Sequence, residues 1–422
     1  MPGNPRKTAS LDLPPLARDI ASAVDAAGGR AWVVGGTVRD ALLGRPSKDV
    51  DLEVHGIEAA RLHKVLAKVG PVAKVGRSFG VFKVGPGADP IDVALPRPSA
   101  PVDTQTRGEV QGDPHMGLEA ACRGRDLTIN AIAADALSGE LVDPTGGIDD
   151  LAHRRLRAAE ASRFGDDPLR VVRVARFAGN LGFLPTEELV GICRALSLEQ
   201  VAMERVAGEL EKLLLKSERP SIGLKVLHDT YAWPTVLSEV DWHPGLGPQV
   251  DRAAGLTQRV GPPPRSLALL LGALLGGTPA SVAASQLTAL RIHRRDGFDV
   301  QASVVAALQH LPALQPEATD TVLRTMAEQV ECAVAIAIAE AVSATELDGL
   351  HRRATELGVL HSALVPLLFG RDLVALGVRR GPAMGRILKE VRAAQLRGDV
   401  ATPETATRLA ETLWTSEQAQ RV

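Results

Sequence analysis

The feature that most constrains the fold is a change in hydrophobic pattern near residue 150 of the 422-residue chain. Before that point, short apolar runs bounded by Gly and Pro alternate with short helical segments, a mixture typical of α+β folds. After it, long segments rich in Ala, Leu, Arg and Glu show helical spacing, interrupted by turns such as HPGLGPQ and GPPPR. The pattern predicts an α+β head with a small mixed sheet, followed by an extended all-α remainder.

Within the head, the expected elements follow one another closely. Leu16, Ile20 and Val24 recur at helical spacing, and this first helix ends at a glycine pair before the strand AWVV. The next elements are a short helix TVRDALL, the acidic strand KDVDLEV, a helix over residues 62–69 and the strands VFKV and IDVAL. These short elements are expected to position the chemistry of the chain.

The strand KDVDLEV carries three carboxylates on one side. Side chains alternate across a strand, so Asp49, Asp51 and Glu53 share one face, while the Val and Leu residues between them face a core. The Cα atoms of successive members of this row are about 6.6 Å apart. Such a row repels itself unless water screens it or a cation binds. A solvated strand face is the alternative for an isolated Asp-x-Asp.

The segment VVGGTVRD, just upstream, favours the cation. Gly36 opens a helix where backbone N–H groups can approach an anion, and Arg39 adds a guanidinium for phosphate; a plain tight turn is the alternative. Asp49 and Asp51 could then hold a pair of Mg²⁺ ions about 3.5–4 Å apart for nucleotidyl transfer. Asp92, in IDVAL, is a candidate third carboxylate on a neighbouring strand, with its register left open.

A second candidate site lies in FGDDPLRVVRVARF. Pro168 suits a first helical position, so Asp167 is expected to be the N-cap of a helix carrying Arg170, Arg173 and Arg176. An acceptor beside a cationic donor can read cytosine and adenine, which present an amino group next to a ring-nitrogen acceptor, and reject uracil and guanine. A capping Asp beside solvated arginines is the alternative.

These motifs together resemble the class II tRNA nucleotidyltransferase and bacterial poly(A) polymerase family, whose head is similar to that of polymerase beta. The resemblance covers residues 31–177, and its further matches are VGRSFGVFKV, IDVALPR, RDLTINAIAAD and DPTGGIDDL; residues 370–400 are similar to the family's tail, more loosely. It implies that Asp167 and Arg170 read the base, that Arg173 and Arg176 lie near the nucleotide, and that Arg125 contacts it. Asp126 is implied near the ribose hydroxyls.

The chain departs from the family pattern at two places. Residue 124 is Gly where the family commonly has Arg, which affects a secondary contact. A mobile loop that influences the final A addition in the family commonly contains a Gly-His-Arg-Gly-like stretch, and this chain has TRGEVQGDPHM instead. His228-Asp229 resembles an HD phosphohydrolase dipeptide, but the sequence offers no further ligands at suitable spacing, so a chance dipeptide is the interpretation.

Composition limits the partners and the cellular compartment that are expected for the chain. A net charge of −2 gives no global attraction to nucleic acid, so RNA contacts are expected from local clusters, above all the arginines and lysine of residues 379–397. Solvated faces are the alternative for each cluster. Three scattered cysteines, no signal-like N-terminus and no apolar run of about 20 residues favour a cytoplasmic protein with no membrane contact and no evident obligate protein partner.

The resemblance implies four parts and one activity. The parts are a catalytic head over 1–150, a neck with the base-reading helix over 151–225, a body over 226–315, and an RNA-binding tail over 316–422. The activity is template-independent addition of CMP and AMP from CTP and ATP to the tRNA 3′ end, with Mg²⁺ as cofactor. A CC-adding or A-adding enzyme or a poly(A) polymerase would use the same residues, and a catalytically silent RNA-binding module is the alternative of another class.

Overall fold

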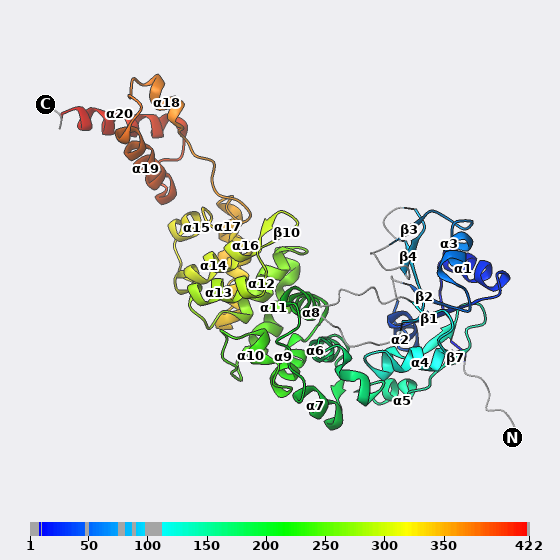
Figure 1. The fold of residues 1–422 in the computed structure, drawn as a ribbon. Helices are drawn as coiled ribbons and strands as arrows, with labels where there is room; N and C mark the ends of the chain where they lie inside the picture. The colour runs from blue at the N-terminus through cyan, green and yellow to red at the C-terminus, as the bar shows by residue number, and fades with distance from the viewer. Residues whose placement is uncertain are drawn as a thin grey trace. The chain divides into compact units, whose positions relative to one another are not determined.

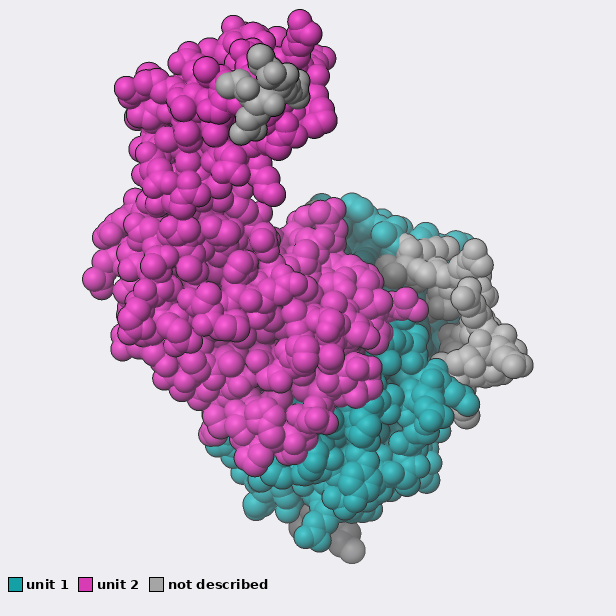
Figure 2. Space-filling model, turned by 90° about the vertical axis from the view of Figure 1, so that its left-hand side faces the viewer, with its two compact units in different colours: residues 1–213, 222–236 teal, residues 214–221, 237–422 magenta. Residues whose placement is uncertain are grey.

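The computed structural model describes residues 8–9, 11–46, 50–74, 81–86, 90–97 and 112–419. The chain divides into two compact units, shown in different colours in Figure 2. Unit 1 comprises residues 1–213 and 222–236, and unit 2 comprises residues 214–221 and 237–422.

Unit 1 is built on a mixed sheet whose strands lie in the order β3-β4-β5-β2-β1-β6-β7 (Figure 1). Strands β2 and β5 are parallel, and the other neighbouring strands are antiparallel. The mixed sheet predicted for the head is thus confirmed. In chain order the strands are β1 (Arg30–Val34), β2 (Asp51–His55), β3 (Val72–Lys74), β4 (Val81–Val84), β5 (Ile91–Ala94), β6 (Ala133–Asp135) and β7 (Leu141–Val142).

Helices and buried side chains cover the sheet. Helix α1 (Pro15–Ala26) packs against β1 and α3 (Ala59–Leu66), with the predicted Ile20 and Val24 fully buried. On the face to which Trp32 points, the buried cluster includes Cys122 of α4 (Leu118–Arg123). Strand β1 passes directly into α2 (Gly36–Leu42) through Gly35 at the end of the strand.

Residues after the sheet are mainly helical, as the change of pattern predicts. A 3₁₀ helix, Ala161–Asp166, leads into α6 (Arg170–Leu181), and the small parallel pair β8 (Arg155–Leu156) and β9 (Leu184–Pro185) was not predicted. Helix α5 (Gly147–Ala152) precedes the strand pair. The helices that follow the pair are α7 (Glu187–Arg194), α8 (Met203–Lys216), α9 (Pro220–Asp229) and α10 (Trp233–Val236).

Unit 2 is helical apart from the hairpin β10 (Arg294–Arg295) and β11 (Phe298–Asp299). Helix α12 (Arg265–Leu274) is buried from Ser266 onward. No helix in the described ranges combines the length and apolar character needed to span a membrane. The other helices are α11 (Leu246–Val260), α13 (Ala280–Ala289), α14 (Val300–His310), α15 (Asp320–Met326), α16 (Cys332–Ser343), α17 (Asp348–Glu356), α18 (Gly370–Ala375), α19 (Pro382–Arg397) and α20 (Pro403–Ala419).

Candidate nucleotide-binding site

The turn between β1 and α2 forms one wall of a pocket in unit 1. Gly35 has a φ of +73°, a backbone conformation that residues with a Cβ atom rarely adopt. A Cβ at this position would lie 3.4 Å from Arg125 Nη1 and 3.9 Å from Asp51 Oδ2. The sharp turn therefore brings the Gly35-Gly36 backbone next to one cationic and one anionic side chain.

Strand β2 brings Asp51 to this pocket, and the neighbouring strand β5 carries a second carboxylate, Asp92. Asp51 and Asp92 are register partners on the parallel strands β2 and β5. Directly paired residues of neighbouring strands point to the same face, so the register that the sequence left open puts both carboxylates on one side of the sheet. Lys83 of β4 contacts Asp92 at 2.7 Å. Asp49 lies outside the described residues.

Glu53 has an environment that the acidic strand did not predict. Its side chain is buried, with Oε2 accepting from Arg125 Nη2 at 3.0 Å and Oε1 lying 3.1 Å from His55 Nε2. Burial raises the pKa of Glu53, but the hydrogen bond from His55 and the charge of Arg125 outweigh it and lower the pKa below its ordinary value. Glu53 thus holds Arg125 at the pocket rather than facing solvent.

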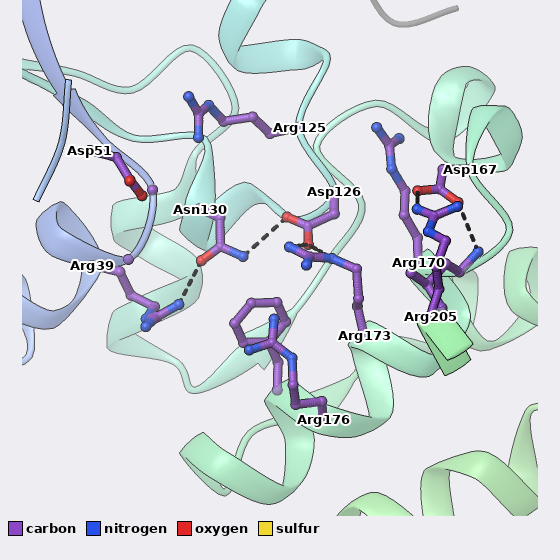
Figure 3. A pocket seen from close by; sticks show the side chains of 14 residues that line it. Arg39, Asp51, Arg125, Asp126, Asn130, Asp167, Arg170, Arg173, Arg176 and Arg205 are labelled. Atoms are coloured by element: carbon purple, nitrogen blue, oxygen red, sulfur yellow. Dashed lines mark hydrogen bonds and ion pairs between the residues drawn. The ribbon is translucent and has the colours of Figure 1, made fainter. Parts of the chain in front are cut away.

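Asp126 is the centre of a chain of polar contacts behind the pocket. Its Oδ2 accepts from Arg173 Nε at 2.8 Å, and its Oδ1 accepts from Asn130 Nδ2 at 3.1 Å. Asn130 Oδ1 in turn accepts from Arg39 Nη1 at 2.8 Å. Burial raises the pKa of Asp126, but the charge of Arg173 and the hydrogen bonds bring it down to about 2. Asp126 therefore links α6 to α2, through an ion pair with Arg173 and through the amide of Asn130 to Arg39 (Figure 3).

The residues expected to read the base lie side by side at the start of α6, but they are not paired as a simple donor–acceptor couple. Arg170 donates from Nη1 to the carbonyl of Arg163 at 2.8 Å and from Nη2 to the carbonyl of Gly124 at 2.7 Å. Asp167 Oδ2 accepts from Arg205 Nη2 of α8 at 2.7 Å. Each member of the candidate pair is thus held by a different part of the chain.

The predicted N-cap at Asp167 is wrong. Helix α6 begins at Arg170 and its N-cap is Leu169, because Asp167 and the two residues after it form a bend and turn following the 3₁₀ helix. Asp167 still bonds the backbone nearby, accepting from the Leu169 N–H at 3.2 Å. Its side chain is therefore oriented by a local turn rather than by a helix end.

Three arginines gather around one aromatic ring at the base of the pocket. The guanidinium carbons of Arg39, Arg173 and Arg176 lie 5.3, 5.6 and 4.0 Å from the centre of the Phe177 ring. Buried Glu209 of α8 lies 2.6 Å from Arg176 Nε and 3.8 Å from Arg173 Nη1. One carboxylate and one ring thus hold cations that would otherwise repel one another.

The pocket has a volume of about 480 Å³ and a net positive lining, with six arginines and three aspartates. This excess of positive charge suits a polyanion such as a nucleoside triphosphate. Figure 3 shows these side chains around the pocket. The lining residues are Gly35, Gly36, Arg39, Asp51, Arg125, Asp126, Asn130, Asp167, Leu169, Arg170, Arg173, Arg176, Phe177 and Arg205.

Of the candidate site residues that the structure describes, all but Asp92 lie in this lining, and the sequence analysis missed several others. Asn130 stands within the motif RDLTINA but was not singled out. Phe177 ends the arginine motif, where it reads as an ordinary core residue. Arg205 and Glu209 belong to MERVAGELEKLLLK, which has the pattern of any amphipathic helix, so the sequence gives no signal for them.

The other cation and cysteine sites considered from the sequence are not built in the described part of the chain. No group of three or more His, Cys, Asp or Glu side chains is placed there to hold a metal ion, so the HD-type metal site is not formed around His228 and Asp229 among the described residues. Cys122, Cys193 and Cys332 are buried free thiols, and burial raises the pKa of each to about 12.

Comparison with known proteins agrees with this geometry. Residues 31–157 match the poly(A) polymerase head domain. A multifunctional CCA protein of Stenotrophomonas maltophilia (strain K279a) is 40% identical over 223 residues, which are 50% of this chain and 52% of that protein. One of Tolumonas auensis is 40% identical over 231 residues, 50% of this chain and 54% of that protein. The chain spans about half the length of the curated relatives it matches.

Solved structures extend the likeness along the chain. The crystal structure of Bacillus stearothermophilus CCA-adding enzyme in complex with CTP has a TM-score of 0.73 at 25% identity, covering 96% of this chain and 100% of that chain. The Thermotoga maritima CCA-adding enzyme complexed with tRNA has a TM-score of 0.67 at 21% identity, covering 96% of each chain, and shows the fold alone. The mixed sheet and the pocket thus lie in the part of the chain that begins with the match to the poly(A) polymerase head domain, and helical regions follow it. The chain resembles the class II tRNA nucleotidyltransferase and poly(A) polymerase family, and residues 31–157 match the poly(A) polymerase head domain.

Proposed function

We propose that the chain adds CMP and AMP to the 3′ end of tRNA without a template, using CTP and ATP and releasing pyrophosphate. One observation carries the proposal: the carboxylate of Asp51, the cations suited to a triphosphate and the candidate base-reading residues line a single pocket. The names of the matched relatives and the CTP complex of the Bacillus stearothermophilus enzyme support it.

The chemistry of the carboxylates fits Mg²⁺. Asp51 offers hard oxygen ligands at the pocket, and Asp92 shares its side of the sheet. We propose Asp51 and Asp49 as the ligands, with Asp92 as a third carboxylate. Bound Mg²⁺ would lower the pKa of the attacking hydroxyl and neutralise charge developing on the pyrophosphate.

The remaining residues act by binding and orientation. Gly36 and Arg39 hold the triphosphate beside Asp51, while Arg125 contacts the sugar end of the nucleotide. Arg173 and Arg176, clustered on Phe177, add positive charge at the nucleotide. Placement and charge neutralisation then supply the rate enhancement without a covalent nucleophile.

Base selection falls to Asp167 and Arg170. A carboxylate accepts the exocyclic amino group of cytosine or adenine, and the guanidinium donates to the adjacent ring nitrogen. Uracil and guanine would place an oxygen against the carboxylate. Both side chains line the pocket, and two backbone carbonyls hold the guanidinium in place.

We also propose a division of labour along the chain. Residues 1–150 act as the catalytic head and residues 151–225 as a neck that reads the base. Residues 226–315 form a body, and residues 316–422 form a tail that binds RNA through its cationic side chains.

The experiment uses tRNAs that end before the first C, between the two C positions, and before A. Each is incubated with one labelled nucleotide and Mg²⁺. Three ordered additions that then stop are expected. An unlimited A tail on unrelated RNA would instead indicate a poly(A) polymerase, and a product limited to CC or to A would indicate a partial enzyme.

The Asp51→Asn variant is the control for catalysis. It is expected to lose at least about 100-fold in incorporation, since the Mg²⁺ ligand is lost while the pocket keeps its shape. Asp19→Asn, on the exposed side of α1, should behave as the unmodified chain. A chain that incorporates nothing, or one unaffected by Asp51→Asn, would refute the proposal and favour a silent RNA-binding module.

A further inference from the structure

The Arg205 side chain of α8 reaches the pocket from a segment that no motif singled out. Its Nη2 donates to Asp167 Oδ2 at 2.7 Å, across 38 residues of sequence. Both side chains line the pocket, and Figure 3 shows the guanidinium facing the carboxylate. The contact therefore fixes the residue that the proposed function assigns to base selection.

We infer that Arg205 is a positioning residue for nucleotide selectivity. By holding one oxygen of Asp167, it keeps the carboxylate in the orientation that accepts the amino group of cytosine or adenine. This inference rests on the proposed function and deepens it, because it names what makes the acceptor rigid.

The carboxylate needs this restraint because its own torsion is soft. The terminal torsion of an Asp side chain is broad, so a single local contact leaves the plane of the carboxylate poorly defined. Here Oδ1 accepts from the Leu169 N–H at 3.2 Å, while Oδ2 accepts from Arg205 at 2.7 Å. Two donors on two oxygens fix the plane, and each oxygen keeps a lone pair for a base.

Arg170 is restrained independently. Its two terminal nitrogens donate to the backbone carbonyls of Arg163 and Gly124. The donor half of the reader is thus set by main-chain atoms, and the acceptor half is set by Arg205. Loss of Arg205 should loosen the acceptor while leaving the donor in place.

The rigidity of the Asp167 carboxylate should affect the selectivity between nucleotides more strongly than it affects the affinity for CTP and ATP. A fixed carboxylate meets the O4 of uracil or the O6 of guanine with acceptor against acceptor, which penalises these bases. A carboxylate that can rotate away avoids the penalty. Loosening Asp167 should therefore weaken CTP and ATP binding and, in relative terms, favour UTP and GTP.

The opposite role would be a lock, in which Arg205 occupies Asp167 and competes with the base. The two roles predict opposite changes in CTP affinity when Arg205 is removed. A lock predicts tighter CTP binding when Arg205 is removed, whereas a positioning residue predicts weaker binding and a lower CTP-to-UTP ratio.

The test compares Arg205→Met and Arg205→Lys with the unmodified chain. Binding of CTP, ATP, UTP and GTP is measured directly with Mg²⁺, and kcat and KM are measured for single incorporations. Arg205→Met is expected to lower the CTP-to-UTP and ATP-to-GTP ratios about tenfold, since a hydrogen bond to a charged group is lost. Arg205→Lys, which keeps the charge, should recover part of each ratio.

The matched control is Arg194→Met on α7. Arg194 also donates through its guanidinium, to the Asp229 carbonyl at 2.7 Å, but it is not among the residues lining the pocket. The CTP-to-UTP and ATP-to-GTP ratios of the Arg194→Met variant should equal those of the unmodified chain. Circular dichroism of both Arg205 variants checks folding, and Arg205→Lys keeps the test valid if Arg205→Met unfolds.

Unchanged ratios in a folded Arg205→Met chain would overturn the inference, as would tighter CTP binding. If Arg205→Met does not fold, unchanged ratios in Arg205→Lys would overturn it. An unmodified chain that binds CTP and ATP selectively but extends no tRNA would overturn the proposed function alone, because the binding ratios still report on Arg205. An unmodified chain without selectivity in binding or incorporation would overturn both.

Discussion

Replacing Asp126 by Asn tests whether the buried carboxylate stabilises unit 1. The pKa of Asp126 lies at about 2 in the folded chain, against an ordinary value of 3.8. At about 1.4 kcal/mol for each pKa unit, this difference corresponds to about 2 kcal/mol of stability at neutral pH. Asp126→Asn removes that contribution and leaves Arg173 without the nearest carboxylate.

The pH dependence follows from the direction of the shift. A carboxylate whose folded pKa is depressed stabilises the chain fully above its unfolded pKa, and this stability is lost as pH falls toward the folded value. The free-energy difference between the unmodified chain and Asp126→Asn should therefore be full at pH 7 and begin to shrink below about pH 4. It should fall by up to about 1.4 kcal/mol per pH unit.

Calorimetry between pH 7 and pH 3 measures this difference. Because the chain has two compact units, the shift is expected in the unfolding transition of the unit that contains residue 126. Asp19→Asn, an exposed control in the same unit, should change the transition little at any pH. A difference between the unmodified chain and Asp126→Asn that is equal at pH 7 and pH 3 would refute the reasoning.

Three further substitutions probe other residues of the site and a buried pair of ion pairs outside the pocket. Phe177→Leu should raise KM for CTP and ATP alike by about tenfold, because the ring no longer gathers the guanidiniums, and steady-state kinetics with an unchanged KM would contradict this role. Glu53→Gln should raise both KM values several-fold above pH 5, where the depressed pKa of Glu53 keeps its pair with Arg125 intact; a variant with the same KM values would show that the pair is not needed. Asp150 is fully buried and pairs with Arg155 and Arg157, so Asp150→Asn leaves both arginines facing a neutral side chain. Calorimetry should show a loss of about 3–5 kcal/mol in the free energy of unfolding. Asp149→Asn, at an exposed position, should cost about 1 kcal/mol or less. Equal losses for these two variants would argue against the buried ion pairs.

The parts of the site that could be predicted lie within continuous motifs. The glycine turn, Asp51 and the arginines of α6 were all expected, because each motif combines a turn or helix signal with the residues that act. The strands VFKV and IDVAL were expected for the same reason, since alternation within a few residues determines which side chains face the core. Local sequence was enough wherever the determining contacts are local.

The contacts that could not be predicted are long-range. Glu53 and Arg125 are 72 residues apart, so nothing in the acidic strand indicates that one of its carboxylates is neutralised and buried. The register between Asp51 and Asp92 depends on strand pairing, which a single strand pattern leaves open. Arg205 and Glu209 contact residues of the pocket from a helix whose spacing specifies only an apolar face.

Arg170 takes its two partners from the main chain, at Arg163 and at Gly124. Every amino acid carries that carbonyl, so the side chain at residue 124 is free to drift during evolution without releasing the guanidinium. The departure at residue 124 from the arginine that is common in the resembled family therefore leaves both backbone contacts of the proposed base-reading Arg170 in place.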